Sequence, residues 1–148
     1  MGAYSPPKPS AQKQYSILKL RDPSGTGQIH QGKLTWRWNS QPTPVSRVYQ
    51  VRLTCNSKGW PEVFIDSPDL HLLAGSRRIP HLYDQDLVRL CLYLPGTGQW
   101  TTSKMLANTI VPWTSLWLLF FEEWLWSDEW KGGGLHPPAD EDKKEDVK

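Results

Sequence analysis

Three short segments alternate apolar and polar side chains: residues 32–39, 47–55 and 62–66. This period of two is the pattern of a β-strand that is buried on one face. In the first segment the large side chains of Trp36 and Trp38 share one face, opposite charged and polar neighbours. Because polar turns and prolines separate the segments by only a few residues, the pattern predicts an antiparallel meander.

The C-terminal half of the chain carries a helical pattern instead. Hydroxyl side chains at residues 101–103 can cap a helix running to about Ile110, and Pro112 suits the first turn of a second helix. Large apolar side chains then recur at helical spacing: Trp113, Leu116, Trp117, Phe120, Phe121 and Trp124. The glycines at residues 132–134 are expected to end this helical region. Strands in succession followed by helices predict an α+β fold.

The length of 148 residues fits one compact domain, and nine tryptophans supply large apolar areas for its core. Residues 1–14 contain three prolines among lysines and polar residues, which predicts a flexible lead-in. Residues 138–148 are rich in charge and predict a flexible tail. A single domain is therefore expected over residues 15–137. Its first segment, residues 15–21, is interpreted as a short strand or a turn of helix.

Composition excludes several classes of protein. The formal net charge of +2 is too small to indicate a nucleic-acid partner. The longest uninterrupted apolar run, residues 116–121, is far shorter than the roughly 20 residues of a membrane-spanning helix. Two cysteines do not make a secreted disulfide framework, and the N-terminus lacks the pattern of a secretory signal. The chain is expected to be cytoplasmic, without a membrane partner.

Cys91 is the strongest candidate for chemistry because of its neighbours. An apolar residue flanks it on each side, His81 precedes it by ten residues, and Trp100 follows it by nine. The polar residues 84–86 predict an exposed loop, which would leave the next segment near solvent. A cysteine acts as a nucleophile only where it is accessible and its thiolate is favoured, and a nearby Arg89 would favour the thiolate.

Other kinds of site find less support. The two cysteines and four histidines show no paired close spacing of the zinc type. A serine triad would need a G-x-S-x-G elbow, and the two Gly-Thr-Gly segments lack the lysine of a phosphate-binding loop. Cys55 shares a strand face with Tyr49 and Val51, so we predict that it is a core residue. No metal ion or cofactor is expected.

The stretch around Cys91 resembles the active-site segment of ubiquitin-conjugating enzymes, in which a His-Pro-Asn motif lies ten residues before the acceptor cysteine. His81 falls at the histidine of that motif, Cys91 at the acceptor cysteine, and Trp100 at a tryptophan that follows it. Leu82 and Tyr83 replace the proline and the asparagine. Because Tyr83 replaces the asparagine, the chain lacks the side-chain amide of the motif at this position.

The resemblance covers roughly residues 33–137 and favours the bacterial branch of the family. Members of that branch sit beside cGAS-like nucleotidyltransferases in CBASS antiphage defence operons. The resemblance implies a ubiquitin-conjugating-enzyme-like α+β fold, with a four-stranded antiparallel meander sheet followed by C-terminal helices. It also implies that residues 15–137 form a single catalytic domain of the transferase class.

The resemblance implies that Cys91 forms a thioester with the C-terminus of a partner protein and passes it to an amine. The expected cargo is a cGAS-like nucleotidyltransferase, and an activating enzyme is a further candidate partner. His81 is expected to support the loop by hydrogen bonds with the backbone, with a general-base role as the alternative. Tyr83 offers one hydroxyl donor in place of the asparagine amide.

Three other side chains and two other functions are left open. Asp84 and Asp86 could orient or deprotonate an incoming lysine, although solvated loop acids are the simpler interpretation. His136 could return toward the site from the tail. The first alternative function is a non-catalytic binding module with the same fold, which the missing asparagine favours. The second is a cysteine hydrolase in which Cys91 and His81 release the cargo to water.

Overall fold

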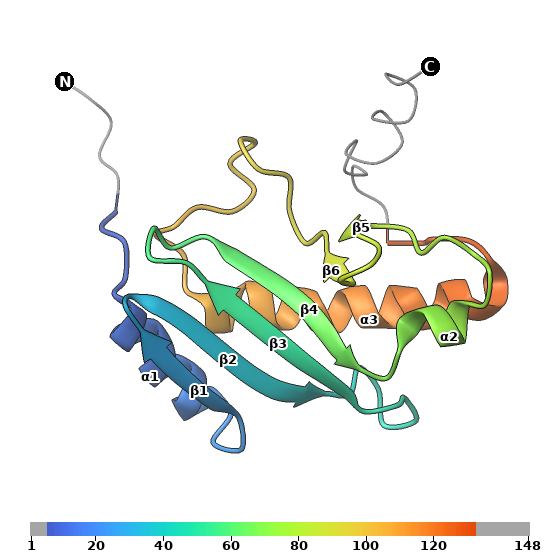
Figure 1. Ribbon diagram of the computed structural model, residues 1–148, viewed down its shortest axis with the longest axis horizontal. Helices are drawn as coiled ribbons and strands as arrows, with labels where there is room; N and C mark the ends of the chain where they lie inside the picture. The colour runs from blue at the N-terminus through green and yellow to red at the C-terminus, as the bar shows by residue number, and fades with distance from the viewer. Residues whose placement is uncertain (1–5, 133–148) are drawn as a thin grey trace.

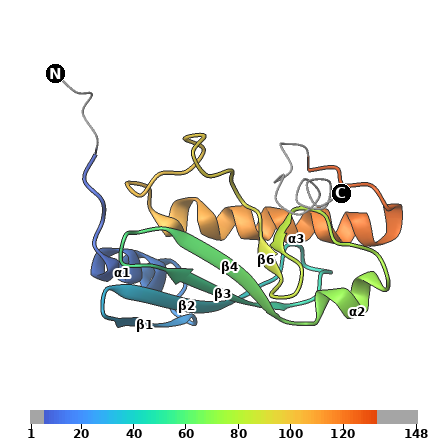
Figure 2. The same cartoon turned by 45° about the horizontal axis from the view of Figure 1, so that its top comes forward.

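The computed structural model describes residues 6–132 of the chain. Its elements are, in chain order, α1 (Ala11–Arg21), β1 (Thr26–His30), β2 (Lys33–Ser40), β3 (Tyr49–Cys55), β4 (Pro61–Ser67), α2 (Leu70–Ala74), β5 (Leu82–Asp84), β6 (Arg89–Leu90), the 3₁₀ helix η1 (Leu106–Asn108) and α3 (Ile110–Ser127). The strands form one antiparallel sheet in the order β1-β2-β3-β4-β6-β5 (Figure 1). Figure 2 shows α3 as a separate layer along this sheet. The predicted α+β class, with an antiparallel sheet and a C-terminal helix, is confirmed.

The sheet has six strands, so the expectation of four strands was wrong. The central strands β2, β3 and β4 are those that the alternating pattern predicted. Strand β1 was missed because it has no buried side chain and therefore no apolar alternation. Strands β5 and β6 were missed because they contain only three and two residues, which is too short for a period to show.

The core lies between the sheet and the helices, and the alternation of β2 builds its centre. Trp36 and Trp38 are both buried, as their shared face predicted. The Tyr15 ring of α1 meets the Trp36 ring edge-on, with the centroids 5.9 Å apart. A side chain at Gly25 would overlap the Trp36 ring, so this close approach of the turn after α1 requires glycine.

Helix α1 begins earlier than the sequence indicated. The Ser10 hydroxyl accepts a hydrogen bond from the Lys13 N–H at 3.1 Å, which is a standard N-cap. Residues 11–14, expected in the flexible lead-in, are the first turn of this helix, and residues 15–21 are the rest of it. The N-cap at Ser10 starts the helix inside the range that was assigned to the lead-in, directly after the last of its three prolines.

The C-terminal region contains one long helix where two were expected. Met105 has an extended backbone (φ −83°, ψ 128°), which interrupts the first predicted helix and leaves only η1 before α3. Pro112 lies in the first turn of α3, as predicted. The helix ends at Ser127, where Asp128 takes the left-handed conformation, and not at the glycines that follow. No helix within residues 6–132 is both long and apolar enough to cross a bilayer.

The segment between β4 and β5 contains the short helix α2. The Asp69 carboxylate accepts a hydrogen bond from the His71 N–H at 2.9 Å and caps this helix at its start. Gly75, with a φ of 71°, ends it. With only five residues, α2 is too short to give a helical period in the sequence.

Candidate active site

The β5–β6 hairpin brings His81 and Cys91 together, because His81 directly precedes β5 and Cys91 directly follows β6. The Cys91 N–H donates a hydrogen bond to the His81 carbonyl at 3.0 Å. The Trp117 indole N–H of α3 donates to the same carbonyl, also at 3.0 Å. His81 takes a positive φ of 54°, which is uncommon for a residue other than glycine. The His81 carbonyl therefore accepts two hydrogen bonds, which connect the start of the hairpin to Cys91 and to α3.

The His81 ring is buried and stacks on the Trp130 ring, with the centroids 5.0 Å apart. Trp130 lies beyond the end of α3, where the left-handed Asp128 reverses the chain. Its ring also packs on Trp117 at a centroid distance of 5.3 Å. Aromatic residues of α3 and of the segment after it thus pack around the His81 ring.

The Cys91 thiol is less accessible than the sequence indicated, since only 8% of the residue is exposed. Its sulfur lies 3.8 Å from the Tyr93 carbonyl oxygen. Burial raises the pKa of the thiol, while the Tyr83 hydroxyl, the Arg89 charge and the Tyr93 backbone oppose that rise. The pKa stays above its ordinary value, so the thiol is mainly protonated near neutral pH.

The hydroxyl of Tyr83, the residue that the sequence resemblance places at the motif asparagine, donates to the Tyr93 carbonyl at 2.7 Å. The Arg89 guanidinium lies over the Tyr83 ring, 5.0 Å from its centroid, and also pairs with Glu62 at 3.5 Å. Burial and the neighbouring Cys91 raise the pKa of Tyr83 well above its usual range. Tyr83 therefore remains protonated and acts as a hydrogen-bond donor rather than as a base.

The substitution Tyr83→Phe is expected to slow alkylation of Cys91 by iodoacetamide at pH 8 by on the order of tenfold. The Tyr83 hydroxyl lowers the pKa of Cys91, so its removal raises that pKa and leaves less thiolate at a given pH. The profile of alkylation rate against pH should move to higher pH with an unchanged plateau. Tyr93→Phe is the matched control, because the Tyr93 hydroxyl donates to Pro61 instead. Equal profiles for the two variants would contradict this role of Tyr83.

The other residues singled out in the sequence have structural surroundings. Asp84 accepts a hydrogen bond from the Leu87 N–H at 2.9 Å and so shapes the hairpin turn, and Asp86 is exposed. Trp100 is buried, and its indole N–H donates to the Thr109 hydroxyl at 2.9 Å. His136 lies outside the described residues.

An apolar groove of about 160 Å³ opens beside Cys91. The residues that line it are His81, Cys91, Leu92, Trp113, Leu116, Trp117, Phe120, Trp130 and Gly132. The helical spacing of the aromatic residues placed Trp117 in the core but gave no sign that its N–H holds the His81 carbonyl. Trp130 was missed as a site residue because its position depends on the chain reversal after α3.

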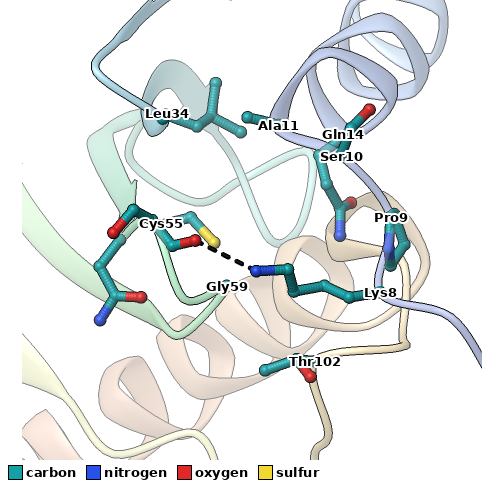
Figure 3. A pocket seen from close by; sticks show the side chains of 12 residues that line it. Lys8, Pro9, Ser10, Ala11, Gln14, Leu34, Cys55, Gly59 and Thr102 are labelled. Atoms are coloured by element: carbon teal, nitrogen blue, oxygen red, sulfur yellow. Dashed lines mark hydrogen bonds between the residues drawn. The ribbon is translucent and has the colours of Figure 1, made fainter. Parts of the chain in front are cut away.

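A second cavity, of about 220 Å³, lies between the segment before α1 and the turn that joins β3 to β4. Figure 3 shows the Lys8 side chain crossing it toward Cys55, with a hydrogen bond from the ammonium to the Ser57 carbonyl at 3.1 Å. Cys55 is buried, as predicted for a core residue. Burial raises the pKa of its thiol to about 11, although Lys8 opposes the rise. This thiol is therefore protonated at neutral pH.

The family model of the Type II CBASS E2 proteins matches residues 14–137. The chain belongs to this family. The matched region contains His81, Cys91 and the whole groove, so the site described above lies within it. Comparison with curated proteins found none that matches the chain. Membership of the Type II CBASS E2 family places the chain among E2-like, that is ubiquitin-conjugating-like, proteins of CBASS antiphage defence.

Proposed function

We propose that this Type II CBASS E2 protein has a ubiquitin-conjugating-like fold and acts as an acyl carrier. Cys91 would hold the C-terminus of a partner protein as a thioester and pass it to an amine. The observation that supports this most strongly is the hydrogen bond from the Cys91 N–H to the His81 carbonyl at 3.0 Å. It joins the two residues that correspond to the family motif and its acceptor cysteine at one site, beside an open groove.

The partner that we propose as cargo is a cGAS-like nucleotidyltransferase, because the family is defined by its association with CBASS. The cargo enters with an activated C-terminal carbonyl, and an activating enzyme is the partner proposed to supply it. Attachment of that C-terminus to an amine would then regulate the nucleotidyltransferase within the defence system.

The chemistry consists of two acyl transfers. In the first, the Cys91 thiolate attacks the activated carbonyl, a C–S bond forms, and the bond to the activating group breaks. In the second, an amine attacks the thioester, a C–N bond forms, and the C–S bond breaks. The thiolate leaves and takes up a proton from the attacking amine. The Tyr83 hydroxyl would have to turn from the Tyr93 carbonyl to donate its one proton to the developing oxyanion, which is the role that the motif asparagine would have.

A second candidate function is a binding module that docks the partner without acylation. It is favoured by the burial of Cys91, of which 8% is exposed, and by the raised pKa of its thiol. A nucleophilic cysteine usually lies in a partly exposed site that lowers its pKa. Under the acyl-carrier proposal, the cargo must reach the sulfur through the groove that Cys91 lines.

The substitution Cys91→Ser is expected to trap the cargo on the protein. A serine ester resists attack by amines far more than a thioester does, so the acylated form should survive purification after co-expression with the neighbouring genes of the operon. Intact mass spectrometry would show an added mass that is lost in alkali and retained in reductant. Fragmentation would identify the cargo and locate the ester at residue 91.

The matched control is Cys91→Ala, which has no nucleophile at that position and should show no added mass. An unmodified Cys91→Ser protein that still copurifies with its partner would contradict the acyl-carrier proposal and support the binding module.

A further inference from the structure

The groove beside Cys91 differs in character from the rest of the surface near the site. Within residues 6–132, nine residues line it: seven are apolar or glycine, and the other two are Cys91 and His81. Arg89 and Glu62, the ion pair near the cysteine, lie outside this lining. Among the described lining residues other than Cys91, only the His81 imidazole can ionise, so a carboxylate or ammonium placed in the groove would lose its hydration without meeting a lysine, arginine, aspartate or glutamate there.

The wall of the groove is built by packing that extends beyond α3. Trp130 contacts three rings, with centroid distances of 5.0 Å to His81, 5.3 Å to Trp117 and 6.1 Å to Phe120. Gly132 lies flat against this wall, where an added Cβ would stand 2.5 Å from the Phe120 ring and 2.8 Å from the Trp130 nitrogen. The segment after α3 thus packs closely along the groove and forms part of its wall.

The size and position of the groove restrict what can occupy it. A volume of about 160 Å³ is well below the roughly 300–1,000 Å³ of pockets for cofactors and drug-sized ligands. It suits one or two amino-acid residues. Because Cys91 itself lines the groove, an acyl group bonded to its sulfur begins there. The rim is open at Leu116, which is 49% exposed, so a peptide chain can leave past it.

We infer that this groove binds an apolar side chain next to the C-terminal residue of the acyl group that Cys91 carries. This inference rests on the proposed function. It adds a specificity to that function: Trp113, Leu116, Phe120 and Trp130 select a cargo with an apolar residue at that position and reject one with a charged residue. An apolar side chain gains by leaving water for this lining, and a charged one loses.

The test uses short acetylated dipeptides that end in glycine and are activated as thioesters of 2-mercaptoethanesulfonate. Their variable residue is leucine, phenylalanine, aspartate or lysine. The Cys91 sulfur forms a new C–S bond, the C–S bond to the sulfonate thiol breaks, and the proton of Cys91 passes to the leaving thiolate. The rate of mass gain at Cys91 of the full chain is measured by peptide mapping. We expect the leucine and phenylalanine peptides to react at least about tenfold faster than the aspartate and lysine peptides.

The substitution Leu116→Lys provides the diagnostic variant, because it adds a positive charge at a half-exposed rim position without changing the buried core. We expect this variant to be acylated more slowly by the leucine peptide and faster by the aspartate peptide. Leu20→Lys, on the 73% exposed position of α1, is the matched control and should keep the original order of rates. Because the added lysine lies in the groove that Cys91 lines, it can also favour the thiolate. Each acylation rate is therefore divided by the rate of Cys91 alkylation by iodoacetamide in the same protein, which separates selectivity from a change in thiol reactivity.

The outcomes distinguish the two proposals. Equal rates for the four peptides, or an unchanged order in Leu116→Lys, would overturn the specificity inference and leave the acyl carrier standing. If no peptide acylates Cys91 while iodoacetamide still alkylates it, both the acyl carrier and the inference that rests on it are overturned.

Discussion

Cys91→Ala is expected to abolish acyl capture completely, while Cys55→Ala leaves it intact. Both cysteines are buried, yet only Cys91 lines the apolar groove, which His81 also lines. Its thiol also has the Tyr83 hydroxyl and the Arg89 charge beside it, and both favour the thiolate. Burial is the main influence on the pKa of the Cys55 thiol and raises it to about 11. At neutral pH its thiolate is therefore rarer than that of an ordinary cysteine.

The measurement is covalent capture of the partner on co-expression, followed by protection of cells against phage. Loss of both in Cys91→Ala, with both retained in Cys55→Ala, is the expected result. Because Cys55→Ala removes buried atoms, thermal unfolding of each variant must show a folded protein before capture is compared. Capture and protection that persist in Cys91→Ala would rule out a role for this cysteine as acceptor. Protection without capture would instead favour the binding module.

The strands that carry a buried face could be predicted from the sequence, and those without one could not. In β2 the alternation of Trp36 and Trp38 with polar residues indicates which face packs against the helices, so the strand could be predicted from the sequence. Strand β1 makes five residue pairs with β2 but has no buried side chain, so its pairing through the backbone leaves no apolar alternation in the sequence. Its only local signal is the two-residue turn at Gln31 and Gly32, both with positive φ.

For the candidate site, the spacing of His81 and Cys91 selected a segment of the chain but could not predict the arrangement within it. The contact between them runs from a main-chain N–H to a main-chain carbonyl, which no residue type specifies. Trp117 lies 36 residues from His81 in the sequence and meets it only because α3 packs along the hairpin. The burial of Cys91 likewise depends on this tertiary packing, and a polar loop before it could not reveal that.

Gln14→Ala is expected to lower the free energy of unfolding by about 2–4 kcal/mol. Gln14 is 5% exposed, and its side-chain amide bridges α1 to the segment before α3. The amide N–H donates to the Lys104 carbonyl at 3.0 Å, and the amide oxygen accepts from the Leu106 N–H at 3.0 Å. Truncation leaves the buried Leu106 N–H without its acceptor, which costs about 1–3 kcal/mol, and removes the part-buried bond to the Lys104 carbonyl, which contributes about 1 kcal/mol. Urea unfolding of the full chain measures the change directly.

Gln12→Ala is the matched control, because it makes the same substitution two residues earlier on the same helix. Gln12 is exposed, and its replacement should change the stability by less than about 0.5 kcal/mol. Both substitutions alter the helix propensity of α1 equally, so the difference between them isolates the two hydrogen bonds of Gln14. A loss of similar size in both variants would show that the cost comes from α1 itself. A loss in Gln14→Ala alone would show that the buried Gln14 side chain stabilises the packing of α1 on the segment before α3.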